Sequence, residues 1–464
     1  MSRNRRVERR RERHDVSILY RKADCCIVAG GGRMSPNTST LEWKASPLRY
    51  VCQLNPPVSF HEFEEDDELT FLPMDRVKSG YFIPNTDKFS KYASSYNAFE
   101  DGDIVLAKVT PCFENGNIAI AENLVNGKGF GSSELFVVRA TVVDRKFLFY
   151  YFQSSTFKQE GEASMTGAGG LKRVSPEIIR EHHVFFPPRI SQRIIADYLD
   201  RETERIDALV VEKLRMLFLM EEKRATFISH VITRGLNPDA PLKSSGLDWL
   251  GDIPTHWEVR RCGTLFEEVD ERNQPDLPLL HVSLNTGVTL RVFSDDRIES
   301  VAADYSSYKV AKKNHLVFNK MRFWQGAAGI APEDGLTSPD YTVASYGNEI
   351  FPGYLQFLVR LSLFSNEVRR YSYGMVDDRL RLYWNEFKNI RIPLPPFEEQ
   401  HLIVAALSKE AKRIFDLEDA LRMSITLAKE RRAALITAAV TGQIDCSSDG
   451  INCSTENRAS VVLR

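Results

Sequence analysis

The sequence lacks the patterns on which membrane insertion, disulfide frameworks and structural zinc sites depend. No apolar run reaches the roughly 18 residues that a membrane span requires, and the chain begins with an arginine-rich segment unlike a signal peptide. Its 7 cysteines form no C-x-x-C pair and do not cluster with histidine. These absences predict a soluble protein with scattered thiols in a reducing compartment, and we expect it in the cytoplasm.

The chain also lacks the basic excess that is usual for a small DNA-binding domain. Its formal net charge is −2 at pH 7. Residues 41–188 carry 15 basic and 20 acidic side chains, and residues 247–393 carry 17 and 20. Any nucleic-acid-binding face must therefore be local, or partner subunits must supply much of the phosphate contact.

Catalytic motifs are missing as well. The sequence NPPV at 55–58 resembles the N-P-P-aromatic loop of adenine methyltransferases, but Val58 has no aromatic face to stack on a flipped base. The three glycines at 30–32 are not followed by the lysine and hydroxyl residue of a phosphate loop. The Pro-Asp pair at 339–340 lacks the further carboxylates and the lysine of a metal-dependent nuclease core. We therefore expect no catalytic residue, metal or cofactor on this chain.

An internal repeat is the strongest positive feature of the sequence. The segments FPP at 186–188 and LPP at 394–396 stand 208 residues apart, and from there the two copies align without a gap for about fifty residues. The matching positions include Gln192 and Gln400, Ile206 and Ile414, Leu209 and Leu417, Arg224 and Arg432, and Thr233 and Thr441.

Both copies of the repeat have the apolar spacing of a long helix with a heptad seam. We predict helices over 189–236 and 394–445, each beginning after a Pro-Pro pair and ending near a glycine. The first seam comprises Ile195, Leu199, Ile206, Leu209, Met216, Met220 and Phe227. The second comprises Ile403, Leu407, Ile414, Leu417, Leu421, Ala428 and Leu435. We expect the two helices to form an antiparallel coiled coil; alternatively, each helix packs on its own globular domain.

Short β-branched segments bounded by turn residues fill the regions between the repeats and predict strands. The expected fold is therefore α+β, with mixed α/β domains over 41–188 and 247–393 separated by the two long helices. A linker is expected over 237–246. Residues 1–40 and 446–464 are expected to be disordered tails; the basic N-terminal one is alternatively an over-extended start or a nucleic-acid-binding arm.

Several motifs are similar to those of the specificity subunits of type I restriction–modification systems. LPPFEEQ at 394–400 resembles the beginning of that family's conserved helix, and KERRAALI at 429–436 with VTGQID at 440–445 resembles its end. GLDWLGDIP at 246–254 with HWEV at 256–259 resembles the start of a target recognition domain. Shorter likenesses are KVTP at 108–111 with ENG at 114–116, and NKMR at 319–322 with WQG at 324–326. The first domain departs from the pattern, because it lacks the Trp-Leu-Gly opening and has RIS at 189–191 in place of an acidic pair.

The resemblance implies a non-catalytic bacterial or archaeal protein that reads double-stranded DNA. Each domain would recognise one half of an asymmetric, two-part target, chiefly through base edges in the major groove. The coil would set the spacer between the halves and dock two adenine methyltransferase subunits. ATP-dependent nuclease/translocase subunits would join through these, so S-adenosylmethionine, ATP and Mg²⁺ are expected on the partners.

The candidate DNA-reading residues lie in the strand–loop motifs, after the glycine-rich segment of the first domain, and in the corresponding place before the second helix. They are Lys108, Lys172, Arg173, Lys320, Arg322, Arg379 and Arg381. The alternative is that several are solvated surface charges. For the whole chain, the alternatives are a coiled-coil adaptor that contacts only protein, an enzyme fused to recognition domains, and an orphan specificity subunit without partners.

Overall fold

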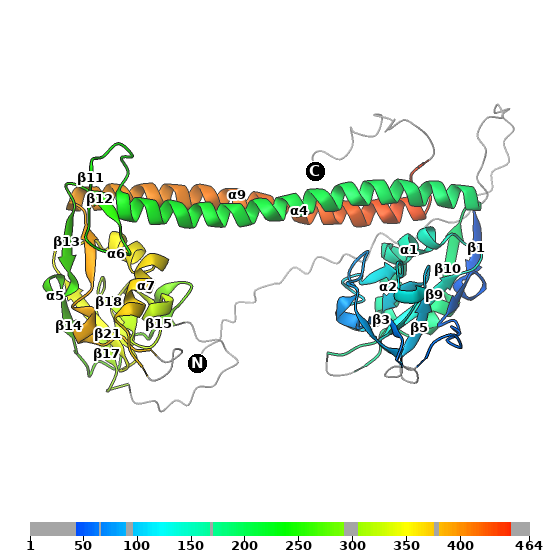
Figure 1. Cartoon of the computed structure of the whole chain (residues 1–464), viewed down its shortest axis with the longest axis horizontal. Coiled ribbons are helices and arrows are strands. Elements are labelled where there is room, and N and C mark those ends of the chain that lie inside the picture. The colour runs from blue at the N-terminus through cyan, green and yellow to red at the C-terminus, as the bar shows by residue number, and fades with distance from the viewer. Residues whose placement is uncertain are drawn as a thin grey trace, which may run out of the picture.

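The protein forms a long rod of two helices with a globular domain at each end, both domains lying on the same side of the rod (Figure 1). The computed structural model describes residues 43–64, 66–89, 96–167, 170–291, 305–374 and 380–446. The expected tail at 1–40 lies outside the described residues, as does the expected tail at 446–464 apart from Cys446. Among those described, no helix combines the length and the apolar character needed to cross a membrane.

The rod is made of α4 (Arg189–Arg234) and α9 (Phe397–Val440), which run in opposite directions. At 1.5 Å per residue their 46 and 44 residues give lengths of roughly 65–70 Å. Each follows a Pro-Pro pair, and glycines with positive φ, Gly235 and Gly442, lie at their C-terminal ends. The expected α+β fold with an antiparallel two-helix coil is therefore confirmed.

Domain 1 precedes α4 in the chain and lies at the end of the rod where α4 begins and α9 ends. Its helices are α1 (Arg145–Gln153), α2 (Ser155–Ala163) and α3 (Glu177–Glu181). Its strands are β1 (Lys44–Pro47), β2 (Cys52–Leu54), β3 (Glu68–Leu72), β4 (Thr86–Lys88), β5 (Asn97–Glu100), β6 (Ile104–Ala107), β7 (Ile118–Ile120), β8 (Lys128–Gly131), β9 (Leu135–Ala140) and β10 (His183–Phe186).

Domain 2 lies between α4 and α9 in the chain. Its helices are α5 (Cys262–Leu265), α6 (Pro352–Leu358), α7 (Ser362–Arg370) and α8 (Trp384–Phe387). Its strands are β12 (Asp252–Pro254), β13 (Glu258–Arg261), β14 (Phe266–Val269), β15 (Leu280–Ser283), β16 (Gly287–Leu290), β17 (Lys309–Ala311), β18 (Leu316–Asn319), β19 (Ala328–Ile330), β20 (Gly335–Thr337), β21 (Tyr341–Tyr346) and β22 (Arg391–Leu394). The expected linker over 237–246 contains one further strand, β11 (Leu242–Ser244), which pairs with β12.

The two domains share one sheet topology although their sequences differ. The central sheet of domain 1 has the strand order β2-β9-β6-β7, and that of domain 2 has the order β14-β21-β18-β19. In both, the middle pair is antiparallel, with Ile104 opposite Val138 in β6 and β9 and Leu316 opposite Ala344 in β18 and β21. A second ribbon, β1-β10 or β13-β22, connects each domain to the start of a long helix. The duplication therefore extends from the helices to the whole domains.

The ends of the long helices belong to the domain cores, whereas their middles pack only on one another. Leu199 and Ile436 join the core of domain 1, and Ile232 and Ile403 join that of domain 2. The middle is a small separate cluster of Val210, Leu217, Leu421, Ile425 and Ala428. Both expectations for the long helices, a paired coil and packing on a globular domain, therefore hold in part. Each helix packs on a different domain at each of its two ends, and between the domains the two helices form a two-stranded coil.

The seam of the coil is shifted by one residue from the predicted one in the middle of the rod. Leu209 is 50% exposed, Met216 46% and Leu417 47%, so these three predictions of a seam position are wrong. Val210 and Leu217 are buried instead, because alternating steps of four and three residues continue from Leu199 to those positions. The other predicted seam residues are buried or half-buried: Ile195, Leu199, Ile206, Met220, Phe227, Ile403, Leu407, Ile414, Leu421, Ala428 and Leu435.

A buried glutamine at the start of each long helix connects that helix to its neighbouring domain. The Gln192 side-chain oxygen accepts a hydrogen bond from the backbone N–H of Asp144 at 2.7 Å, where α1 begins. The Gln400 oxygen accepts one from the N–H of Phe351 at 2.8 Å, where α6 begins. Each amide nitrogen donates to the carbonyl of the proline five residues earlier. The repeat therefore preserves the joint between helix and domain, not only the apolar seam.

Candidate nucleic-acid interface

The predicted DNA-reading residues gather at one edge of the central sheet in each domain. In domain 1, Lys108 directly follows β6, and its carbonyl accepts a hydrogen bond from Val174 at 2.7 Å. Arg173 pairs in β-bridges with Thr166 and with Val109, so the segment after the glycine-rich stretch returns beside Lys108. Lys172 is adjacent and exposed. Three residues chosen from separate motifs are therefore neighbours in space.

Domain 2 repeats this arrangement at the end of β18. The carbonyl of Lys320 accepts a hydrogen bond from Leu382 at 2.8 Å, and Arg381 forms a β-bridge with Tyr373. Lys320 and Arg381 thus correspond in position to Lys108 and Arg173. Arg322 is exposed in the turn that follows β18. Arg379 lies outside the described residues.

An acidic residue lies beside each basic pair, and sequence reasoning missed both. Glu134 and Asp340 stand immediately before β9 and β21, each with its backbone N–H donating to a serine hydroxyl two residues earlier, Ser132 at 3.2 Å and Ser338 at 3.4 Å. The shared pattern of Ser-x-acid before a buried strand was visible in the sequence. It carried no signal of proximity to Lys108 or Lys320, because strands far apart in the chain bring these groups together.

The acidic residues behave differently in the two domains. Glu134 forms an ion pair with Arg173, with a shortest distance of 2.7 Å. This hydrogen-bonded guanidinium lowers the pKa of Glu134 below its usual value, against a smaller effect of burial. Asp340 is exposed, and among the described residues Arg381 makes no ion pair. The edge of domain 1 therefore holds its arginine in place, whereas the exposed arginine of domain 2 has no carboxylate partner among the residues that the structure describes.

Domain 2 contains a buried lysine that the sequence analysis did not identify. The Lys309 side chain is only 4% exposed, and its nearest carboxylate oxygens belong to Glu268 at 3.8 Å and Asp270 at 3.9 Å. Burial lowers the pKa of Lys309, and the nearby Lys320 contributes in the same direction. Asp270 is hydrogen-bonded by Arg272 at 2.7 Å, which lowers the pKa of its carboxyl. Lys309 and Arg272 thus share a compact network of alternating charges with Glu268 and Asp270.

The NPPV segment has a structural role in domain 1. Asn55 has a positive φ of 47°, and its side-chain oxygen accepts a hydrogen bond from the backbone N–H of Val137 at 3.0 Å. Its own N–H donates to the carbonyl of the same residue at 2.7 Å. Asn55 therefore extends the β2–β9 ladder, and its amide is occupied by the sheet.

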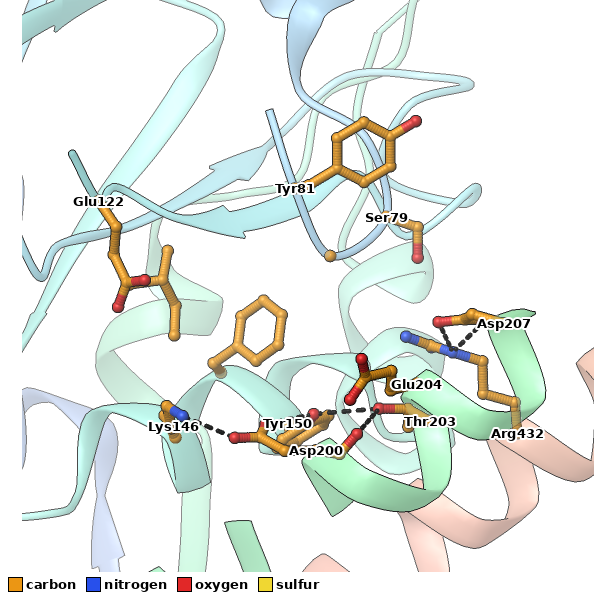
Figure 2. Close-up of a pocket in the computed structure, with 13 residues that line it drawn as sticks. Ser79, Tyr81, Glu122, Lys146, Tyr150, Asp200, Thr203, Glu204, Asp207 and Arg432 are labelled. Carbon is orange, nitrogen blue, oxygen red and sulfur yellow. Dashed lines mark hydrogen bonds and ion pairs between the residues drawn. The ribbon is translucent and has the colours of Figure 1, made fainter. Parts of the chain in front are cut away.

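A polar cavity of about 450 Å³ separates domain 1 from the coil (Figure 2). On its lower wall, Asp200 accepts hydrogen bonds from Lys146 at 2.6 Å and from the Tyr150 hydroxyl at 2.7 Å. Arg432 of α9 forms an ion pair with Asp207 of α4 at 3.0 Å. These contacts fasten domain 1 to α4, and α4 in turn to α9.

The corresponding joint of domain 2 has a different chemistry. The repeat places Ser408 where α4 has Asp200, Lys412 where it has Glu204, and an exposed phenylalanine, Phe415, where it has Asp207. The two joints are therefore unlike, although the buried glutamines beside them are the same.

The middle of the coil exposes many large apolar side chains. On α4, Val211, Leu214 and Phe218 follow one flank of the seam, and Leu209 and Met216 follow the other. On α9 the exposed members are Phe415, Leu417, Met423 and Leu427. Such contiguous apolar surface is unusual on a protein without a partner.

Comparison with known proteins gives a consistent family match. The sequence matches the family described as "Type I restriction modification DNA specificity domain" twice, over residues 41–213 and 254–427. It is 34% identical over 158 residues to the type I restriction enzyme EcoAI specificity subunit of Escherichia coli, covering 33% of this chain and 26% of that protein. It is 32% identical over 162 residues to the EcoEI specificity subunit of the same organism, covering 34% and 27%. The chain thus aligns with about a quarter of the length of these curated relatives.

Solved structures with low sequence identity share the fold. A chain from a structure of a type I restriction–modification system, described for its complex assembly and conformational transition, aligns with a TM-score of 0.66 and 18% identity, covering 89% of this chain and 100% of the other. The HsdS subunit from Thermoanaerobacter tengcongensis aligns with a TM-score of 0.52 and 18% identity, covering 88% and 99%. At this identity the likeness establishes the arrangement of domains and helices.

Proposed function

Since the chain belongs to the type I restriction modification DNA specificity domain family, we propose that it is the sequence-reading subunit of a type I restriction–modification complex. Each domain binds one half of a bipartite DNA target, and the rod holds the two domains at a fixed separation. The observation that carries this proposal is the duplicated architecture: two domains of one topology, with different residues at equivalent sheet edges, joined by two repeated helices. Equivalent folds with unlike edges fit a target whose halves differ.

The sheet edge that carries Lys108 and Arg173, or Lys320 and Arg381, is the proposed DNA-reading surface of each domain. Arginine can donate two parallel hydrogen bonds to guanine in the major groove, and lysine suits phosphate or single acceptors. The acidic residues at the same edge keep the local net charge low. We therefore assign these edges to base recognition and expect partner subunits to add sequence-independent phosphate contacts.

The rod serves as the spacer that separates the two half-sites. Both domains lie on the same side of it (Figure 1), so one DNA duplex running along that side can meet both. Because each long helix is part of both domain cores, its length sets the distance between the domains. A change in helix length is therefore expected to change the unread spacer.

The exposed flanks of the coil are the proposed docking sites for two adenine methyltransferase subunits. A two-stranded coil buries one stripe of each helix, and here apolar residues continue on both sides of that stripe. Within the seam, one carboxylate oxygen of Glu418 is buried without a partner, while the neighbouring Leu417 is exposed. Helices of a partner packed on each flank would cover this apolar surface, and the approximate twofold symmetry of the repeat suits two identical partners.

The chemistry of modification and cleavage is assigned to other subunits. We propose that this chain is non-catalytic, that S-adenosylmethionine binds to the methyltransferase subunits, and that ATP and Mg²⁺ bind to ATP-dependent nuclease/translocase subunits. The segment NPPV at 55–58 resembles a methyltransferase motif, and the side-chain amide of its first residue, Asn55, is hydrogen-bonded within its own sheet. The role left to this chain is to choose the DNA sequence at which its partners act.

Methylation mapping tests the proposal directly. Adenine methylation is mapped across the source genome with the gene intact, with the gene deleted, and with the gene restored. A bipartite, asymmetric motif that loses methylation on deletion and regains it on restoration is the expected result. A motif that does not depend on the gene contradicts it, and purification of the chain with its bound partners then distinguishes an orphan subunit from a protein-only adaptor.

A further inference from the structure

In domain 1, Arg173 differs from the other basic residues of the sheet edge in the way its side chain is held. The main chain is fixed by two β-bridges, to Thr166 and Val109. The guanidinium donates two hydrogen bonds to the Glu134 carboxylate, from Nε to Oε2 at 3.0 Å and from Nη2 to Oε1 at 2.7 Å. An arginine restrained at both its backbone and its guanidinium loses little further rotamer entropy when it binds a ligand.

Glu134 binds one side of the guanidinium, and among the residues that the structure describes no other group is bonded to its outer end. A guanidinium has five N–H groups in a planar fork. Glu134 takes the Nε hydrogen and one Nη2 hydrogen along the side of that fork. Both Nη1 hydrogens and the second Nη2 hydrogen remain, and these form the end-on pair that fits two acceptors in one plane. The Arg173 side chain is 52% exposed, so a ligand can reach this end.

The charge of the pair favours a base edge over a phosphate. The Glu134 side chain is 28% exposed and lies directly beside the guanidinium, so a phosphate bound at the fork would approach a second anion. Guanine offers two neutral acceptors, O6 and N7, at the separation that an arginine fork spans. Lys108 lies at the same edge, with its ammonium 5.5 Å from the centre of the Phe136 ring, and Lys172 is exposed beside it. These lysines can serve the phosphates without occupying the fork.

We propose that Arg173 reads one guanine in the half-site bound by domain 1, and that Glu134 is its positioning residue. The inference rests on the proposed DNA-reading function and names one specificity contact within it. Glu134 does not touch the DNA; it restrains the guanidinium so that the outer fork faces the groove. In domain 2, Arg381 occupies the equivalent position, and no carboxylate within the described part of the chain pairs with it; the restraint is therefore argued for domain 1.

The test uses the full chain assembled with its methyltransferase subunits and a DNA duplex carrying the target found by methylation mapping. Each base pair of the domain 1 half-site is replaced in turn, and the dissociation constant is measured for the wild type and for R173A, R173K and E134Q. The expected result is a roughly tenfold to hundredfold loss of preference for one G·C pair in R173A, because one bidentate contact contributes about that factor to discrimination against the wrong base. R173K loses most of the same preference, and E134Q loses a smaller part of it at the same base pair.

A matched control separates positioning from general stability. Arg180 forms an exposed ion pair with Glu177 at 2.8 Å in the same domain, and R180A is expected to keep the wild-type preference at every position. Thermal unfolding of each variant is recorded alongside, because a loss of fold weakens binding to all sequences equally. Loss confined to one base pair supports the proposal.

Two other outcomes overturn the inference, and a third overturns its premise. Uniform weakening by R173A across all sequences, with a smaller salt dependence, identifies a phosphate contact and refutes base reading. An unchanged preference in R173A refutes any direct role. A wild-type complex without sequence preference overturns the proposed function itself, and the inference with it.

Discussion

The buried amide of Gln400 gives the sharpest test of how the long helices hold the domains. Its oxygen accepts a hydrogen bond from the N–H of Phe351 at 2.8 Å, and its nitrogen donates to the carbonyls of Glu349 and Pro395, both at 2.9 Å. The substitution Q400A removes all three bonds at a fully buried position. The N–H at the start of α6 then has no acceptor and little access to water.

The expected loss can be worked from these bonds. An unsatisfied buried N–H costs about 1–3 kcal/mol, and each of the two lost carbonyl bonds contributes about 1 kcal/mol. Q400A should therefore lower the free energy of unfolding of domain 2 by about 3–5 kcal/mol. Q400E should be at least as damaging at neutral pH, because a carboxylate cannot donate to the two carbonyls. It should recover partly on acidification, when its protonated form regains one donor.

Tryptophan fluorescence during urea unfolding provides a domain-specific readout. The chain has 5 tryptophans, and Trp249, Trp257, Trp324 and Trp384 all belong to domain 2 or its opening segment. The control Q159A removes an exposed glutamine from α2 and should leave the transition unchanged. If Q400A stays within about 0.5 kcal/mol of the wild type, or Q159A falls as far, the buried amide does not have the role assigned to it.

Three further predictions concern the coil, the buried lysine and the spacer. Replacing Val210 with Asp should clearly lower the melting temperature of the chain, because it places a charge in the buried seam. Leu209→Asp should leave the melting temperature nearly unchanged and weaken methyltransferase binding, because Leu209 is exposed. Equal melting temperatures for the two variants would contradict the seam register. Replacing Lys309 with Met should raise stability at neutral pH by roughly 1 kcal/mol, because it removes a buried charge and leaves Glu268 and Asp270 partly exposed to water. The pKa of Lys309 is lower in the folded chain than in the unfolded chain, so above the folded pKa the unfolded chain binds more protons. The free energy of unfolding of the wild type therefore rises as pH increases through that pKa, and its difference from the variant shrinks. A difference in unfolding free energy that stays constant from pH 7 to 10 would contradict this prediction. Deleting one heptad from each helix, residues 210–216 and 422–428, shortens the rod by roughly 10 Å. Methylation mapping should then find a spacer shorter by roughly two to three base pairs with both half-sites unchanged, and an altered half-site sequence would refute the role of the rod as a spacer.

Sequence reasoning located the duplication but misplaced part of the coil seam. Periodicity ranked Leu209 and Leu417 as seam residues because both are large and apolar, and because they match across the repeat. The structure places them outside, since the register of a coil is decided by which face meets the partner helix over its whole length. Periodicity alone cannot distinguish the seam from the exposed apolar flanks, which we propose as a surface for another protein.

The basic residues of the candidate interface were found from motifs, whereas their acidic neighbours were not. Lys108, Lys320, Arg173 and Arg381 occupy equivalent places in two domains, as their positions after strands and glycine-rich segments indicated. Glu134 stands 39 residues from Arg173 in the chain. The antiparallel pairing of β6 with β9, together with the bridge between Val109 and Arg173, brings the two segments to one edge.

The sequence by itself determined that this protein has two long related helices and two strand-rich domains of similar plan, because repeats and hydrophobic periods are local properties of the chain. It also indicated roughly where each helix starts and stops, through paired prolines and a following glycine, although the second helix was predicted over 394–445 and is observed over Phe397–Val440. Only the tertiary structure decided which charges meet, which apolar face of the coil is left exposed, and how a buried glutamine joins each helix to its domain. Those features depend on contacts between segments distant in sequence, and the free energy of such contacts is set by burial and geometry that no local pattern records.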